Sequence, residues 1–169
     1  QFGVAKNIVG DNMSPIYTYA VETAIQITLT ELNENLREIY IEAYTMPETA
    51  EYIYVHTTAE LKQIFGSNFP GYTESDFYEM EIGTSGIMRN YMARKCDIHF
   101  PLDHKLRRFL TAAMRVYKVP EEEQAKVIAF IGSLDIRVIA TEVMYKLFAM
   151  LEMTFDFKLS KDDEEGETI

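Results

Sequence analysis

The chain has a single cysteine, Cys96, and no tryptophan among its 169 residues. One thiol cannot form the internal disulfide framework of many small secreted domains, so the composition favours a reducing compartment. No apolar run approaches the roughly 20 residues that a membrane-spanning helix needs. The residues near the N-terminus show no secretory signal pattern. We therefore expect a cytoplasmic protein that does not bind a membrane.

Positive charge is also scarce. Sixteen lysines and arginines stand against 27 aspartates and glutamates, which gives a formal net charge of −11. Such a surface repels phosphate, so we expect no nucleic-acid binding by the chain itself. Part of the acidic excess lies near the C-terminus, and we expect residues 154–169 to form a flexible acidic tail.

Motifs for catalysis or metal binding are missing as well. No serine lies in a nucleophile elbow, and no glycine-rich loop could hold a phosphate. Cys96, His99 and His104 offer zinc ligands at short spacing, but a second cysteine or histidine pair is lacking. His56 stands alone within a helical segment, which is typical of a structural rather than a catalytic histidine. We expect no enzymatic activity, no cofactor and no metal.

Helical periodicity is what the sequence has in abundance. Apolar residues recur at spacings of three and four over most of the chain. Ser14 and Pro15 form a helix-start signal, Thr45 to Glu48 predicts a capping box, and Pro120 precedes three glutamates. The predicted helices cover about residues 14–32, 34–44, 45–65, 73–94, 102–117, 120–131 and 134–153.

Strand-like alternation is confined to residues 155–159. The fold class expected is therefore all-α, with about seven helices and a helical fragment at the front. That fragment, residues 1–9, has apolar side chains at helical spacing but no N-cap or turn signal before it. We interpret it as the last turns of a helix that begins outside this chain, and expect the chain to be part of a longer protein.

Tyrosine, phenylalanine and methionine are frequent, with 11, 10 and nine copies, and many of them fall inside predicted helices. Tyrosine and methionine suit the wall of an adaptable apolar pocket that has a few polar groups. For any one of them, ordinary core or interface packing is the favoured explanation. For the set as a whole, we expect a pocket between helices.

Three segments carry a family resemblance: LREIYIEAY at residues 36–44, EYIY at residues 51–54 and FYEMEIGTSGIMRNY at residues 77–91. They are similar to the C-terminal ligand-binding and dimerisation domain of TetR/AcrR-type transcriptional regulators, in the version common in low-GC Gram-positive bacteria. The resemblance covers nearly the whole chain up to about Met153. It implies an orthogonal helical bundle, with residues 1–9 as the end of a connecting helix and residues 10–153 as the sensing and dimerising domain.

The resemblance further implies a repressor whose DNA-binding helix-turn-helix precedes this chain, so that DNA is contacted only through that missing domain. A hydrophobic or aromatic small-molecule effector would bind among the helices between about residues 14 and 94. Arg89 is a candidate partner for an acidic group of the ligand. The pocket candidates are Tyr17, Tyr44, Tyr54, His56, Tyr78, Met88, Arg89 and Tyr91.

A homodimer through two long helices is also implied by the resemblance. We expect residues 73–94 and 134–153 to form it, because small residues in the first helix permit close approach and the second is too apolar for a free surface. Packing within the chain explains the same residues equally well. The alternative function is a helical protein-interaction scaffold without a ligand. The dimer-interface candidates are Ile82, Gly83, Ser85, Gly86, Ile139, Val143 and Leu147.

Overall fold

The computed structural model of the chain describes the backbone of residues 2–164 and the side chains of residues 4–152. Every regular element in this part is helical, which confirms the expected all-α fold. Residues 155–159 lie within the last helix and form no strand. The elements in chain order are α1 (Phe2–Val9), α2 (Pro15–Leu32), α3 (Glu34–Thr45), α4 (Pro47–Phe65), the 3₁₀ turn η1 (Gly66–Asn68), α5 (Glu74–Ala93), α6 (Leu102–Val116), α7 (Glu121–Ser133) and α8 (Ile136–Glu164).

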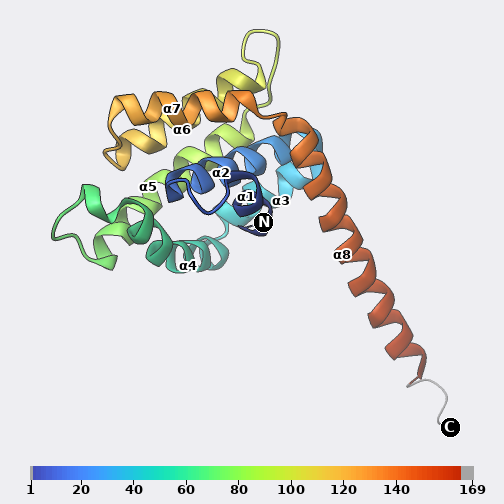
Figure 1. Cartoon of the computed structure of the whole chain (residues 1–169). Helices are drawn as coiled ribbons and strands as arrows, with labels where there is room; N and C mark the ends of the chain where they lie inside the picture. The colour runs from blue at the N-terminus through green and yellow to red at the C-terminus, as the bar shows by residue number, and fades with distance from the viewer. Residues whose placement is uncertain (1, 165–169) are drawn as a thin grey trace.

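Helix α2 forms the centre of the bundle (Figure 1). Among the described helices it packs against each of the other seven α-helices. Its sequence explains this position, because apolar residues cover most of its sides and a helix that is apolar nearly all round is stable only when buried. The side chains that it buries are Ile16, Ala20, Val21, Ala24, Ile25, Ile27, Thr28, Leu29 and Thr30.

The helix ends follow local signals that are visible in the sequence. Thr73 precedes α5, and the Asp76 carboxylate accepts hydrogen bonds from the Thr73 backbone nitrogen at 2.6 Å and from its Oγ1 at 2.8 Å. Gly10 ends α1 with a φ of +77°, a left-handed conformation that glycine adopts without a steric penalty. Such reciprocal and left-handed caps satisfy backbone groups that a helix terminus leaves unpaired.

The capping box expected at Thr45 to Glu48 is not formed. Thr45 belongs to the end of α3, where its Oγ1 donates to the Ile41 carbonyl at 2.6 Å and accepts from Arg89 Nε at 2.8 Å. Met46 occupies the N-cap position of α4, with Pro47 at the first helical position. Proline has no backbone N–H to satisfy and fixes φ near the helical value, so α4 begins without a side-chain cap.

A buried ion network joins α2, α3 and α6. Glu31 Oε1 pairs with Arg37 Nη1 at 3.2 Å and with Lys105 Nζ, and Arg37 Nη1 also donates to the Met92 carbonyl at 2.7 Å. The helical pattern of α6 predicts that Lys105 faces solvent, and this prediction is wrong, since its side chain is fully buried. A lysine can be buried when its ammonium is paired with a carboxylate and hydrogen-bonded, as it is here.

Helix α8 continues past residue 153 to Glu164, so most of the expected acidic tail is helical, and residues 165–169 lie outside the described part. Its first turns pack on α2 through Ile136, Ala140 and Val143. Its C-terminal half extends away from the other helices (Figure 1). None of the described helices is both long enough and apolar enough to span a bilayer.

Candidate ligand cavity

A cavity of about 140 Å³ lies between α2, α4 and α5. Tyr44 from the end of α3 and Phe109 from α6 complete its wall. The cavity is partly open to solvent, and the faces of α4 and α5 that meet α2 there carry polar as well as apolar side chains. The lining residues are Tyr19, Glu22, Thr23, Gln26, Tyr44, Thr57, Glu60, Leu61, Ile64, Glu81, Thr84, Ser85, Met88 and Phe109.

Helix α2 contributes a polar strip to this cavity. Glu22 and Gln26 are four residues apart and therefore lie on one side of the helix. Glu22 Oε1 is buried and has no hydrogen-bond partner. Burial, together with the neighbouring Glu60 carboxylate, raises the pKa of Glu22 from its ordinary 4.5 to about 7. Burial also raises the pKa of Glu60 above its ordinary value.

Glu81 holds a hydroxyl network on the α5 side of the cavity. Its side chain is buried, and its carboxylate accepts hydrogen bonds from Thr84 Oγ1 at 2.8 Å and from Thr57 Oγ1 at 3.2 Å. Tyr117 Oη lies 2.9 Å from Thr84 Oγ1 and donates a longer hydrogen bond of 3.5 Å to Glu81. Burial raises the pKa of Glu81, although hydrogen bonds from these three hydroxyls act in the opposite direction.

The charge of the cavity wall has one sign. Glu22, Glu60 and Glu81 all line it, and neither lysine nor arginine is among the lining residues. A carboxylate that leaves water without a cationic partner is stabilised in its protonated form, which is the direction of all three pKa shifts. The cavity therefore holds acids that would ionise readily if a cation came near.

Tyr19, Tyr44 and Phe109 are the aromatic residues that line the cavity, and two further rings pack against Tyr19. Tyr19 meets Phe65 edge-on, with ring centroids 5.2 Å apart, and Phe65 stacks on Tyr117 at 4.3 Å. Burial raises the pKa of Tyr19 and that of Tyr44 well above the ordinary value. Both phenols therefore stay protonated at neutral pH, where they can donate a hydrogen bond to a ligand.

Of the eight pocket residues expected from the sequence, Tyr44 and Met88 line this cavity. Arg89 does not line it, because its Nε donates to Thr45 Oγ1. His56 is exposed, with its ring stacked on Tyr52 at 3.7 Å.

The other four expected pocket residues are aromatic side chains in contact with other groups. The Tyr17 ring meets the Phe130 ring of α7 edge-on, with centroids 5.3 Å apart. The rings of Tyr54 and Tyr78 meet edge-on, with centroids 6.1 Å apart. Tyr78 Oη also donates a hydrogen bond to the Glu51 carboxylate. The Tyr91 ring lies against Phe100 and Phe109, with centroids 6.4 Å and 6.2 Å away.

The three glutamates of the cavity are not among the pocket residues expected from the sequence. The signal was present on α2, where Glu22 and Gln26 repeat at four-residue spacing within an otherwise apolar helix. Such a strip faces either solvent or an internal cavity, and the sequence alone does not distinguish the two. Glu81 finds its partners partly on distant segments, since the hydroxyls of Thr57 and Tyr117 bond to it together with that of Thr84.

The expected dimer-interface residues differ in accessibility. On α5, Ile82, Gly83 and Gly86 are exposed, whereas Ser85 is buried. On α8, Val143 is buried and packs within the core of the chain. Ile139 and Leu147 are partly buried against the same core. The homodimer and its interface stay a prediction.

Cys96, His99 and His104 do not form a ligand set. The described residues include no group of three histidine, cysteine, aspartate or glutamate side chains that could hold a metal ion. His99 and His104 are exposed, and the Cys96 backbone nitrogen donates to Glu31 Oε2 at 3.2 Å.

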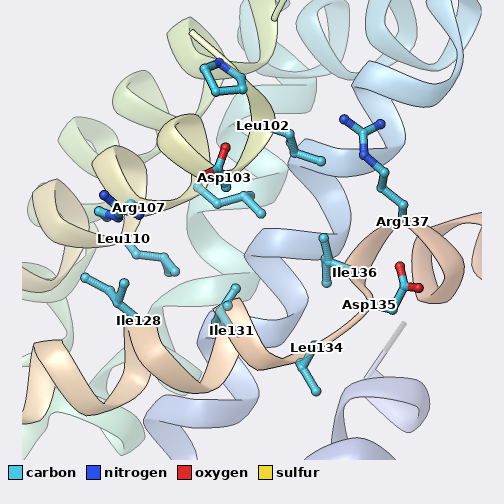
Figure 2. A pocket seen from close by; sticks show the side chains of 13 residues that line it. Leu102, Asp103, Arg107, Leu110, Ile128, Ile131, Leu134, Asp135, Ile136 and Arg137 are labelled. Atoms are coloured by element: carbon cyan, nitrogen blue, oxygen red, sulfur yellow. The ribbon is translucent and has the colours of Figure 1, made fainter.

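A second concavity, of about 340 Å³, lies between α6, α7 and the start of α8 (Figure 2). Figure 2 shows Leu102, Ile131 and Ile136 on different sides of this space, and Asp103 and Arg137 are also among its lining residues. All of its charged lining residues are exposed, and they carry both signs. Ligand sites usually combine an apolar wall with a few converging buried polar groups. The smaller cavity beside α2 has this combination, so we take it as the candidate site.

We compared the chain with known protein families, curated proteins and solved structures. No protein-family model, no curated protein and no solved structure matches the chain.

Proposed function

We propose that this chain is the effector-sensing and dimerising domain of a TetR-type transcriptional regulator, and that the cavity between α2, α4 and α5 is its effector site. The position of the cavity carries the proposal. All of its lining residues except Phe109 fall between residues 14 and 94, the region in which the resemblance implies the effector pocket. Tyr44 and Met88, two of the expected pocket residues, are among them.

Helix α1 offers a route from the cavity to a preceding domain. Ala5 and Val9 are buried in the same core as α2, and α1 packs directly on α2. Glu22 on α2 lies in the cavity wall. A ligand that binds one arrangement of α2 and α4 more tightly than another shifts the population of α1 positions accordingly. In this proposal, α1 is the end of the connecting helix and transmits that shift to DNA-reading heads outside this chain.

Helix α8 supports the dimeric part of the proposal. Ile136, Ala140, Val143 and Leu147 form an apolar stripe on the side of α8 that faces α2. The same stripe continues to Leu151, which is 64% exposed. A second copy of the chain would cover the continuation, and apolar helix faces of this kind commonly form two-fold interfaces.

A ligand-free interaction scaffold is the second candidate. The exposed apolar side chains of α8 favour it, since a different protein could cover them equally well. The two candidates differ in what the cavity does, because a scaffold has no ligand to gain stability from.

The test combines a ligand screen with a mass measurement. In a thermal-shift screen of hydrophobic small molecules, a domain with a functional cavity gains stability, since a ligand that binds only the native state stabilises it. Light scattering at micromolar concentration should give twice the mass of the 19.5 kDa chain. A monomer that responds to no ligand would contradict the proposal, and a monomer that binds a ligand would contradict only its dimeric part.

A further inference from the structure

The cavity lining indicates the chemical class of its ligand. We propose that the cavity binds a small organic cation, a protonated amine carried on a single apolar ring. The inference rests on the proposed function, in which this cavity is the effector site, and specifies what that effector is. It departs from the sequence analysis, which predicts an apolar or aromatic effector with Arg89 as a partner for an acidic group.

The first support is the unpartnered oxygen of Glu22. This oxygen, Oε1, is buried and accepts no hydrogen bond. A buried acceptor without a donor is costly, because it has lost its water and gained nothing in exchange. Glu22 lines the cavity, and a turn of its carboxylate would let the ammonium N–H of a ligand supply the missing donor. Hydrogen bonds between charged groups are also the stronger kind.

The second support is the charge of the whole wall. Glu60 lies close enough to Glu22 for its carboxylate to disfavour ionisation of Glu22. Glu81 lies across the cavity on α5, where it is hydrogen-bonded by hydroxyls and not by a cation. Each of these acids that is ionised would repel an anionic ligand and attract a cation, and a bound cation would itself favour the ionised form.

The third support is the apolar part of the lining. Leu61, Ile64 and Met88 supply aliphatic and thioether surface, and the rings of Tyr19 and Tyr44 are among the lining residues. Aromatic faces attract cations, most strongly where water is excluded. The cavity measures about 140 Å³, close to the engineered cavity of about 150 Å³ that accommodates benzene. One ring with a short amine therefore matches the space.

A bare metal ion does not fit the same wall. The described residues bring no three carboxylate, histidine or cysteine side chains together as a metal site requires. Divalent cations need several oxygen ligands around one point. An organic cation needs only one or two acidic contacts for its charge, and its apolar body uses the remainder of the wall.

The test compares three probes of nearly equal size: benzylamine as its hydrochloride, benzyl alcohol and sodium phenylacetate. Kd is measured by isothermal titration calorimetry at pH 8, where Glu22 is largely ionised. We expect benzylammonium to bind at least about tenfold more tightly than benzyl alcohol, because a hydrogen bond to a charged group is worth more than one between neutral groups. Phenylacetate should bind more weakly than either.

Two variants locate the charge partner. Glu22→Gln keeps the shape of the side chain and removes its charge, so benzylammonium should lose about tenfold in affinity while benzyl alcohol changes little. Glu48→Gln is the matched control, because Glu48 is exposed in the first turn of α4 and does not line the cavity. The melting temperature without ligand confirms that each variant is folded.

The outcomes separate this inference from the proposed function. Equal binding of benzylammonium and benzyl alcohol, or unchanged benzylammonium affinity in Glu22→Gln, would overturn the cationic ligand and leave the cavity as a site for neutral effectors. Tighter binding of phenylacetate would also overturn it. Binding of none of the three probes would overturn the cationic ligand. If the hydrophobic-ligand screen were then also blank, the cavity would fail as an effector site.

Discussion

Lys105 Nζ is fully buried and forms an ion pair with Glu31 across the interface of α6 and α2. Cys96 and Arg94, which follow α5, join the same cluster, since the Cys96 backbone nitrogen donates to Glu31 and the Arg94 carbonyl accepts from Lys105. Two helices far apart in the sequence are thus joined to the segment between α5 and α6. A pair of this kind has a large effect when one partner alone is removed, because the other charge stays buried without compensation.

Replacing Lys105 with methionine should therefore lower the free energy of unfolding by about 3 kcal/mol or more. The matched control is Lys126→Met, which removes an exposed ion pair with Glu122 on α7. That change should cost less than about 0.5 kcal/mol. Urea unfolding followed by circular dichroism measures both. Similar effects of the two substitutions would contradict the structural role assigned to Lys105.

Glu31 should make the protein sensitive to acid. Burial acts to raise its pKa, but hydrogen bonds from Arg37, Lys105 and the Cys96 backbone prevail, and the pKa falls from the ordinary 4.5 to about 2. The Glu31 carboxylate therefore loses its proton more readily in the native state than in the unfolded chain. Its contribution to the free energy of unfolding is complete above about pH 4.5 and is lost as the pH falls toward 2. Glu31→Gln should flatten the decline of melting temperature over that window. An equally steep decline in the variant would show that other groups cause it.

Glu22 should make the protein less stable as the pH rises, the opposite of the effect of Glu31. Its pKa is raised from 4.5 to about 7, so the native state binds a proton that the unfolded chain releases. The free energy of unfolding therefore falls as the pH rises from 4.5 to 7, and Glu60 and Glu81 shift in the same direction. At pH 4.5, Glu22→Gln should have the melting temperature of the wild type. At pH 8, its free energy of unfolding should be higher on the order of 1 kcal/mol, which raises the melting temperature by about 3 °C.

Thermal melting of the ligand-free protein at both pH values measures this effect. Glu48→Gln is again the control, since that exposed residue should leave the difference between the two pH values unchanged. A melting temperature of Glu22→Gln below that of the wild type at pH 8 would show that the charge of Glu22 already has a stabilising partner.

The helices could be predicted from the sequence because their signals are local. Thr73 and Asp76 lie three residues apart and form their cap independently of the remaining fold. Predictions failed where a distant residue decided the outcome. The Thr45 hydroxyl bonds to the Ile41 carbonyl and to Arg89, 44 residues away, instead of capping α4. Lys105 is buried because Glu31, 74 residues away, provides its counter-charge.

The candidate site was harder to predict for the same physical reason. Aromatic and methionine content indicated a pocket, and Tyr44 and Met88 do line the cavity. Most of the other aromatic candidates pack against a second ring, because aromatic side chains fill core and cavity walls equally well. The glutamates carry the proposed ligand class, but the sequence does not reveal that Glu22 and Glu60, on different helices, line the same cavity.

The hydroxyl of Tyr117 should matter less than the ring that carries it. Tyr117→Phe removes the contact with Thr84 and keeps the stack on Phe65, so we expect a loss of about 1 kcal/mol in the free energy of unfolding. Phe65→Ala removes the ring partner and leaves a void, which should cost about 3 kcal/mol or more. Chemical unfolding of the two variants measures the difference. A larger loss for Tyr117→Phe would mean that the Glu81 hydroxyl network dominates this part of the core.

The exposed apolar surface of α8 should control self-association. Leu151 extends the stripe that packs on α2, and Tyr145, on another side of the helix, is 66% exposed. Placing a charge on a buried interface residue typically costs at least as much binding free energy as truncating it, about 2 kcal/mol. The double variant Leu151→Glu with Tyr145→Glu should therefore raise the Kd of a homodimer by roughly 30-fold or more. Sedimentation equilibrium over a range of concentrations gives this constant. Lys146→Gln, an exposed polar change on the same helix, should leave it unchanged. If the double variant associates like the wild type, the second copy binds elsewhere, and the exposed face of α5 around Ile82 and Gly86 becomes the surface to change next.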